Sequence, residues 1–382
     1  MGKRLTIFMF IDALGWEIVK QHKFSTDKLP FRYPVKMQCG YSSTAIPTIL
    51  SGKKPVEHKH FSFYYYDPVK SPFKIFKYLM LQYLPKKIFN RWRVRHFFSK
   101  IIKKINGFTG YFELYSMPYD RLPFFNYCEQ TDIFAANGLA PVKNLCDVLI
   151  ENNKQYIISD WRKPESFNIE QMKQAAKDGD IEFGFLYTAN FDGFLHDNIK
   201  KTDLIGKELL KYEQTLEELL QIGNDNYDDF TLAIISDHGM TPLSGTLDLK
   251  AQIDTLGLKF GEDYAAVFDS TMARFWFLNP PAREQIMKVL SSQTDARLLT
   301  QADKQEYGID FEDNMFGEEI LLVNPGIQIT PCDMGLKPLP GMHGYAPEDK
   351  DSYACCLSNK EATTPPEWVG DFFNMMKSHI KS

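Results

Sequence analysis

Three short apolar runs predict strands that are buried on both faces: residues 5–11, 183–188 and 232–235. Continuous apolar runs of this length are typical of a parallel sheet covered by helices. An amphipathic helix precedes the third run, with an apolar stripe formed by Leu209, Tyr212, Leu216, Leu219 and Leu220. The pattern predicts an α/β fold, a three-layer sandwich with a mostly parallel central sheet.

Each of the three runs ends in residues that can bind a metal. Asp12 follows the first run, Asp192 and His196 follow the second, and Asp237 and His238 follow the third, ahead of a glycine that permits a sharp turn. Residues four apart share a face of a helical turn. In open α/β sheets, ligands bind outside the carboxyl ends of the strands. A surface loop explains any one of these stretches equally well, but three strands that end alike favour a binding site.

In residues 39–52, small hydroxyl side chains precede a short apolar stretch that ends in Ser-Gly. The apolar stretch is a candidate helix. Hydroxyls at a helix N-terminus either cap the helix or help to hold a phosphate there. Late in the chain, His343 stands in a loop bounded by glycines. Mixed Asp and His ligands suit Zn or Mn better than Mg or Ca. Two such ions roughly 4 Å apart stabilise the entering and leaving oxygens of a displacement at phosphorus.

The organisation of the chain predicts a core with two insertions. The core comprises residues 1–55, 140–250 and 341–382, while residues 56–139 form a basic, aromatic-rich cap and residues 251–340 a smaller α+β insertion. Regular alternation of strand and helix patterns is confined to the predicted core.

The cap insertion contains a basic stretch, residues 68–106, with many Lys and Arg and no acidic residue. It predicts one or two amphipathic helices broken near Pro85, with Arg91, Arg93 and Arg95 among the cations. Such a helix can lie on an anionic membrane surface or line a site for an anionic substrate. Packing of its apolar face on the core, with a merely solvated basic face, is the simpler interpretation.

Net charge and cysteine content indicate which binding partners and which cellular location to expect. The 382 residues carry a net charge of -5, so binding to a nucleic-acid duplex is not expected. The six cysteines form no C-x-x-C pair, which predicts reduced thiols and a cytoplasmic location, soluble or peripheral to a membrane. No apolar run is long enough to span a bilayer.

The order of the motifs resembles that of the alkaline phosphatase superfamily, and more narrowly its type I phosphodiesterase/nucleotide pyrophosphatase branch. The matching elements are the first strand ending in Asp12, the segment TILSGKKPVEH, and the motifs DGFLH, SDHGM and MHGY. The resemblance covers the predicted core and hardly touches the basic stretch. It implies an alkaline-phosphatase-like fold with inserted cap segments.

The resemblance also implies a two-metal site. The implied ligand sets are Asp12, Asp237 and His238 with the nucleophile for one metal, and Asp192, His196 and His343 for the other. The family nucleophile stands ten residues before the Gly of a T-G motif, which here gives Ser42, with Ser43 one step away. Ser42 would attack phosphorus to form a covalent phospho-serine, and hydroxide from the second metal would hydrolyse it.

Two departures from the family pattern are visible. Many phosphodiesterases of the family carry an Asn three residues after the nucleophile, where it helps to hold a phosphoryl oxygen, and this chain has Ala45 there. Another donor would then hold that oxygen: a backbone N–H, Asn190, Lys53 or Lys54. Cys39 lacks the C-x-P-x-R setting of sulfatases, which argues against that activity. His58 and His60, near the nucleophile in sequence, are expected to support the site or to be structural.

The expected function is therefore metal-dependent hydrolysis of a small or lipid-linked phosphodiester or pyrophosphate. A phosphomonoesterase or a phosphonate hydrolase is the alternative within the superfamily. Near neutral pH a phosphomonoester carries about one more negative charge than a phosphodiester, and Lys53 and Lys54 could supply the extra cation that a monoester site needs. A metal-binding protein without turnover is the alternative from another class. Contact with a membrane through residues 68–106 remains open.

Overall fold

The computed structural model describes residues 2–79 and 89–381. Contacts divide the chain into a first unit, residues 1–53, 134–242 and 347–382, and a second unit, residues 54–133 and 243–346. His343, which the sequence assigned to the core, belongs to the second unit.

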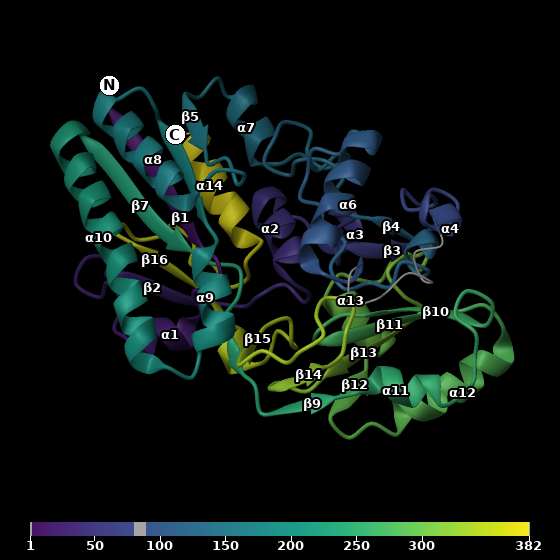
Figure 1. Ribbon diagram of the computed structural model, residues 1–382. Coiled ribbons are helices and arrows are strands. Elements are labelled where there is room, and N and C mark those ends of the chain that lie inside the picture. The colour runs from purple at the N-terminus through teal and green to yellow at the C-terminus, as the bar shows by residue number, and fades with distance from the viewer. Residues whose placement is uncertain (1, 80–88, 382) are drawn as a thin grey trace. The chain divides into compact units, whose positions relative to one another are not determined.

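A six-stranded sheet in the order β2-β16-β7-β1-β6-β5 organises the first unit (Figure 1). Its strands are β1 (Arg4–Ile11), β2 (Phe31–Val35), β5 (Tyr156–Ile158), β6 (Phe183–Thr188), β7 (Asp229–Ile235) and β16 (Ala354–Ser358). β1 pairs in parallel with β6 and β7, and β5 pairs in parallel with β6. β16 runs opposite to the other five strands, pairing antiparallel with β2 and β7, so the prediction of a mostly parallel sheet is confirmed.

The register of the three central strands brings their carboxyl ends to one level. Phe10 of β1 lies opposite Ile235 of β7, and Ile11 lies opposite Thr188 of β6. The polar residues that follow these strands therefore emerge at the same edge of the sheet. This register is what allows segments far apart in the sequence to build one site.

Helices cover both faces of this sheet, which makes the unit a three-layer sandwich (Figure 1). One face carries α1 (Trp16–Gln21), α8 (Glu165–Asp178), α9 (Asn190–Asn198) and α10 (Thr202–Asn226); the other carries α2 (Ser42–Ser51), α7 (Leu145–Glu151) and α14 (Asp371–Lys381). Alternate side chains of β1 point to opposite faces. Ile7 and Met9 pack with Leu216 of α10, whereas Phe8 contacts His379 of α14.

The second unit is built on a four-stranded antiparallel sheet in the order β10-β11-β13-β12. Its strands are β10 (Tyr264–Phe268), β11 (Met272–Phe277), β12 (Ala296–Leu298) and β13 (Glu319–Val323), and α11 (Leu249–Asp254), α12 (Pro280–Ser291) and α13 (Gln301–Glu306) accompany them. One face packs against Ile286 and Leu290 of α12, and the other against aromatic residues from residues 54–133.

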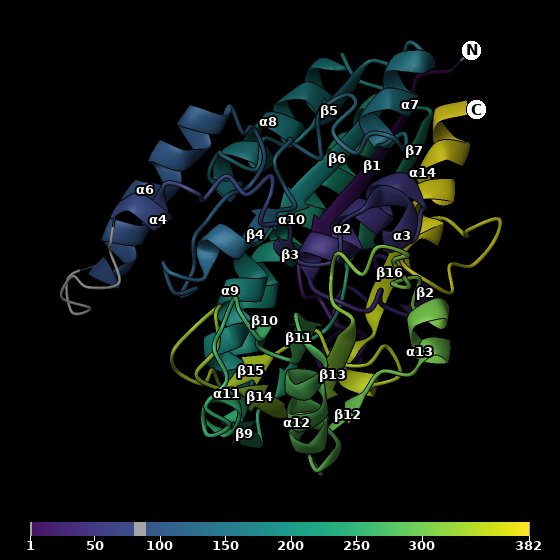
Figure 2. The same cartoon turned by 90° about the vertical axis from the view of Figure 1, so that its right-hand side faces the viewer.

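Residues 54–133 add short elements around that aromatic core. They are α3 (Pro55–His58), β3 (Tyr64–Tyr66), α4 (Phe76–Leu79), α6 (Trp92–Asn106), the 3-10 helix η2 (Leu122–Phe124) and β4 (Phe125–Tyr127). Figure 2 shows α4 and α6 adjoining each other, and the rings of Phe76 and Phe98 are 5.9 Å apart. The predicted break near Pro85 lies outside the described residues.

Short elements complete both units. They are β8 (Thr241–Pro242), β9 (Gly245–Leu247), β14 (Ile327–Ile329), β15 (Gly341–Met342) and the 3-10 helix η3 (Lys350–Ser352). Among the described residues, no helix combines the length and the apolar character needed to cross a membrane. Helix α7 begins at Leu145, because Asn144 caps it by accepting a hydrogen bond from the backbone of Asp147.

Candidate metal centre and nucleophile

Asp12, Asp237 and His238 come together at the carboxyl edge of the sheet in the first unit. Each offers one ligand atom, and these atoms lie within 4.8 Å of one another. All three side chains are buried. Two carboxylates and an imidazole at this spacing form a ligand set that suits a divalent metal ion.

The hydrogen bonds of His238 fix which ring nitrogen faces this group. Nδ1 lies 2.9 Å from the carbonyl oxygen of Gly239, which can only accept, so Nδ1 carries the proton. Nε2 is the ring nitrogen that faces the group, 3.2 Å from Oδ2 of Asp237 and 3.7 Å from Oδ1 of Asp12. A histidine that ligates a metal typically donates its other N–H in this way.

The two oxygens of Asp237 have different surroundings. Oδ1 accepts backbone hydrogen bonds from Ala13, at 3.2 Å, and from His238, at 3.0 Å. Oδ2 is buried and accepts no hydrogen bond from the described residues. Such a buried oxygen is costly without a partner, so its position beside Nε2 of His238 fits a bound cation.

Electrostatics lead to the same conclusion. Burial, and then the charges of Asp237 and Asp192, raise the pKa of Asp12 well above its usual value. Burial also raises the pKa of Asp237, against the lowering effect of His238. Two buried carboxylates that repel each other are stabilised in their ionised form by a divalent cation between them. The residues of this group therefore fit a metal.

Close packing of two glycines positions His238. A Cβ atom on Gly239 would lie 2.1 Å from the carbonyl oxygen of Asp351, and one on Gly15 would lie 2.6 Å from the Cα of Gly239. The sequence suggested that Gly239 serves a sharp turn. Its φ lies outside the positive region, so the close approach of backbone segments is what excludes a side chain there.

Ser42 is the first residue of α2, and its hydroxyl meets the buried group. Its Oγ lies 3.0 Å from Nε2 of His238 and 3.5 Å from Oδ1 of Asp12. Tyr41 occupies the N-cap position and its side chain makes no capping hydrogen bond, so Ser42 does not serve as a cap. Oγ of Ser43 is buried and makes no hydrogen bond with any residue that the structure describes. The geometry therefore distinguishes the two serines.

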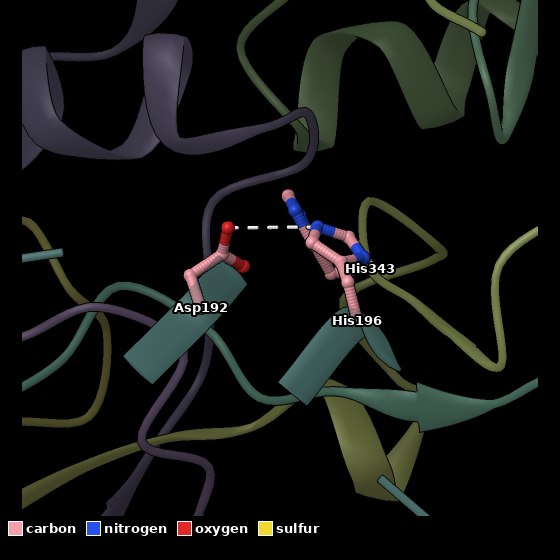
Figure 3. A group of neighbouring side chains, drawn as sticks. All are labelled: Asp192, His196 and His343. Carbon is pink, nitrogen blue, oxygen red and sulfur yellow. Dashed lines mark ion pairs between the residues drawn. The ribbon is translucent and has the colours of Figure 1, made fainter. Parts of the chain in front are cut away.

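A second pair of candidate ligands lies on α9. Asp192 and His196 are one helical turn apart, and Nε2 of His196 lies 3.5 Å from Oδ2 of Asp192 (Figure 3). The expectation that they share a helix face is confirmed. Figure 3 also labels His343, which belongs to the second unit.

Sequence reasoning missed Tyr187, the penultimate residue of β6. Its hydroxyl donates a hydrogen bond to Asp12, which lowers the pKa of that carboxyl against the effect of burial. The ring stacks on Phe10 with centroids 5.2 Å apart, and the backbone N–H donates to Oγ of Ser159. The alternation of side chains along the strand predicts only that Tyr187 and Thr188 point to opposite faces. The contact of Tyr187 with Asp12 depends on the pairing of β6 with β1, which the sequence pattern does not show.

The remaining candidates have the following surroundings. Ala45 is buried within α2, and Asn190 is exposed at the start of α9. Nζ of Lys54 donates to the carbonyl oxygen of Glu306 within the second unit. His58 and His60 are buried in that unit, and burial lowers the pKa of both rings. Nδ1 of His60 lies 2.7 Å from the carbonyl oxygen of His58, as expected of a structural pair.

Comparisons with solved structures define the class of fold. Murine ectonucleotide pyrophosphatase/phosphodiesterase 5 matches with a TM-score of 0.69 at 14% identity, over 99% of this chain and 95% of that one. The human protein of the same name gives 0.69 at 13% identity, with the same shares covered. An inactive form of the murine protein, in complex with AMP, gives 0.67 at 14% identity over those shares. The chain thus shares the fold of these ectonucleotide pyrophosphatase/phosphodiesterase structures.

A match between the sequence and a family model identifies the family within this class of fold. The chain belongs to the type I phosphodiesterase/nucleotide pyrophosphatase family, whose model matches residues 6–346. A sequence comparison with curated proteins returns no match. Membership of this family makes the chain a hydrolase of phosphodiester bonds, and the groups at the sheet edge are its candidate metal ligands.

Proposed function

We propose that this chain hydrolyses a small phosphodiester or pyrophosphate at two divalent metal ions, with Ser42 as the nucleophile. The observation that carries the proposal is the position of Ser42 Oγ, 3.0 Å from Nε2 of His238 beside two buried carboxylates. A serine hydroxyl in such a group is placed for activation by a metal rather than for helix capping.

Each ligand has a role under this proposal. Asp12, Asp237 and His238 would hold one ion; Asp192 and His196 would hold the other, with His343 as third ligand. The assignment of His343 is supported by its place in the motif order and by the type of its side chain. Bound ions would lower the pKa of attached water and stabilise charge on the phosphoryl oxygens. Zn, or alternatively Mn, suits these mixed ligands.

The protein residues account for the bond changes. The Oγ–P bond forms as the bond from phosphorus to the leaving alcohol or phosphate breaks, and the proton of Ser42 passes through solvent to the leaving oxygen. Water then attacks phosphorus: its hydroxyl stays on the released phosphate, and its proton restores the hydroxyl of Ser42 as the Oγ–P bond breaks. Because Ser42 opens the ten-residue helix α2, the phosphoryl group would lie at the positive end of the helix dipole.

The substrate class follows from the family and from one neighbour in fold. The complex of an inactive murine relative with AMP supports a nucleotide-type substrate for this chain. A lipid-linked phosphodiester is the second candidate, because the described part of residues 68–106 exposes cations together with apolar side chains. The predicted cytoplasmic location, with or without membrane contact, remains part of this proposal.

A test compares an aryl phosphodiester with the matching monoester on protein stripped of metal and reloaded with Zn or Mn. We expect metal-dependent turnover that prefers the diester. Preference for the monoester would identify a phosphatase. Turnover that persists in the stripped protein would contradict the metal mechanism and favour His238 as a base for Ser42.

Matched variants test the nucleophile. Ser42→Ala is expected to reduce kcat by at least about a thousandfold with metal content unchanged, because it removes the attacking atom. Ser43→Ala, one position along the same helix, is the control and is expected to stay within about threefold of the parent. The opposite ranking would move the nucleophile to Ser43.

A further inference from the structure

Helix α6 buries one face and exposes another. Arg95, Ser99 and Ile102 are the buried residues. The guanidinium of Arg95 donates to the carbonyl oxygen of Met117 at 2.7 Å and lies 4.4 Å from the ring of Tyr119. Arg95 therefore belongs to the core of the second unit, which corrects its grouping with Arg91 and Arg93 as a surface cation.

The exposed side of α6 carries large apolar side chains. Trp92 is 70% exposed, Phe97 59% and Ile105 69%. On the adjoining α4, Tyr78 is 82% exposed. Single apolar residues are normal on a surface, but several large ones on one short helix mark an interaction site.

Cations are interleaved with these apolar side chains. Arg93, Phe97, Lys100 and Lys104 follow each other at spacings of four, three and four, which places them on one side of the helix. In the part of the chain that the structure describes, Arg93, Lys100 and Lys104 enter no ion pair, and no Asp or Glu occurs between residues 68 and 112. The local charge is thus strongly positive on a chain whose net charge is -5.

We infer that this surface docks on an anionic lipid bilayer. We call it the basic face and define it as Trp92, Arg93, Phe97, Lys100, Lys104 and Ile105. A helix that lies in the membrane interface buries apolar side chains at the level of the head groups and sets its cations against anionic lipid. Aromatic residues such as Trp favour that level of the bilayer.

The apolar members of the basic face favour a bilayer over a soluble polyanion. Phe97 and Ile105 gain free energy only when they leave water, which a lipid surface allows and a phosphate backbone does not. The cations alone would serve either partner. Docking does not depend on catalysis at Ser42, so its test is separate from that of the proposed function.

The test is co-sedimentation of the full chain with vesicles. Phosphatidylcholine vesicles are compared with vesicles in which about a third of the lipid is phosphatidylserine, at moderate salt. We expect binding to the anionic vesicles only. The variant R93Q/K100Q/K104Q should lower the partition coefficient roughly 100-fold, because each cation near the surface contributes about fivefold.

Two further variants separate docking from general attraction. K177Q/K207Q/K337Q removes the same charge from exposed lysines outside the face and should bind like the parent. F97S/I105S keeps the charge and should weaken binding at least about tenfold, because it removes buried apolar area. Melting temperature and turnover of a soluble aryl diester, measured on every variant, confirm that the fold and the active site are intact.

Each other outcome overturns the inference. Equal loss in the face variant and in the lysine control would show unspecific attraction. Binding to single-stranded RNA with no binding to vesicles would identify a polyanion surface. A self-association that F97S/I105S abolishes, again without vesicle binding, would identify an interface between two copies of this chain.

Discussion

The hydroxyl oxygen of Ser42 lies 3.0 Å from Nε2 of His238, although 196 positions separate the two residues in the sequence. The register of β1 and β7 brings Asp12 and His238 to one edge of the sheet, and Ser42, the first residue of α2, meets them there. Because Nδ1 of His238 donates to Gly239, Nε2 is the nitrogen that faces Ser42. The same nitrogen faces both buried carboxylates, so the serine and the ligand set form one group.

Metal binding should stabilise the protein through this group. Zn or Mn at about 100 times Kd is expected to raise the free energy of unfolding of the stripped protein by about 2.7 kcal/mol. In Asp237→Asn most of this gain at the first site should be lost, because the amide carries no charge for the ion. Differential scanning fluorimetry with a metal series measures the change. Glu312→Gln, on an exposed residue elsewhere, is the control; equal stabilisation of the Asp237→Asn variant would remove Asp237 from the ligand set.

Gly239→Ala should impair folding and catalysis together. The new methyl group would lie 2.1 Å from the carbonyl oxygen of Asp351, so the backbone that carries His238 must move. We expect a loss of about 2–4 kcal/mol in the free energy of unfolding, measured by urea titration. Gly193→Ala is the matched control: no atom lies within 4 Å of its Cβ position, and an alanine inside α9 should be neutral or stabilising by up to about 1 kcal/mol.

Tyr187→Phe should weaken metal binding without disturbing the fold. The phenol donates a hydrogen bond to Asp12, and partners of a metal ligand typically change affinity by about 10–100-fold. The ring and its stacking on Phe10 stay in place, so the melting temperature of the stripped variant should match the parent. Isothermal titration with Zn gives the affinity. An unchanged Kd would show that this hydrogen bond does not support the ligand set.

Stability should fall as pH rises because of Glu129, a buried carboxyl of the second unit. Burial, and then the charge of Asp132, raise its pKa from 4.5 to about 8. Between those values the unfolded chain releases a proton that the folded chain retains. Between pH 4.5 and about 8, this one group therefore lowers the free energy of unfolding by up to about 1.4 kcal/mol for each pH unit of increase. Glu129→Gln should flatten the difference in denaturant midpoint between pH 5 and pH 8; an unchanged difference would show that Glu129 ionises normally.

The sequence predicted the sheet and the residues at its edge because buried parallel strands leave a strong local signal. The bounds of β6 were predicted to the residue, and α9 does place Asp192 and His196 on one turn. Other features depend on contacts between distant segments and leave no local pattern. The hydrogen bond of Tyr187, the close approach of Gly15 to Gly239 and the burial of Arg95 are of this kind. Arg95 in particular stands in a basic run whose pattern does not show which cation turns inward.

The most direct test of the central claim identifies the residue that becomes phosphorylated. Metal-loaded protein is mixed with an excess of an aryl phosphodiester, quenched in acid during turnover, digested and mapped by mass spectrometry. The account predicts an adduct on Ser42 that carries the phosphoryl group with the ester that did not leave, present in Ser43→Ala and absent from Ser42→Ala. An adduct on Ser43, or steady turnover by Ser42→Ala, would contradict it.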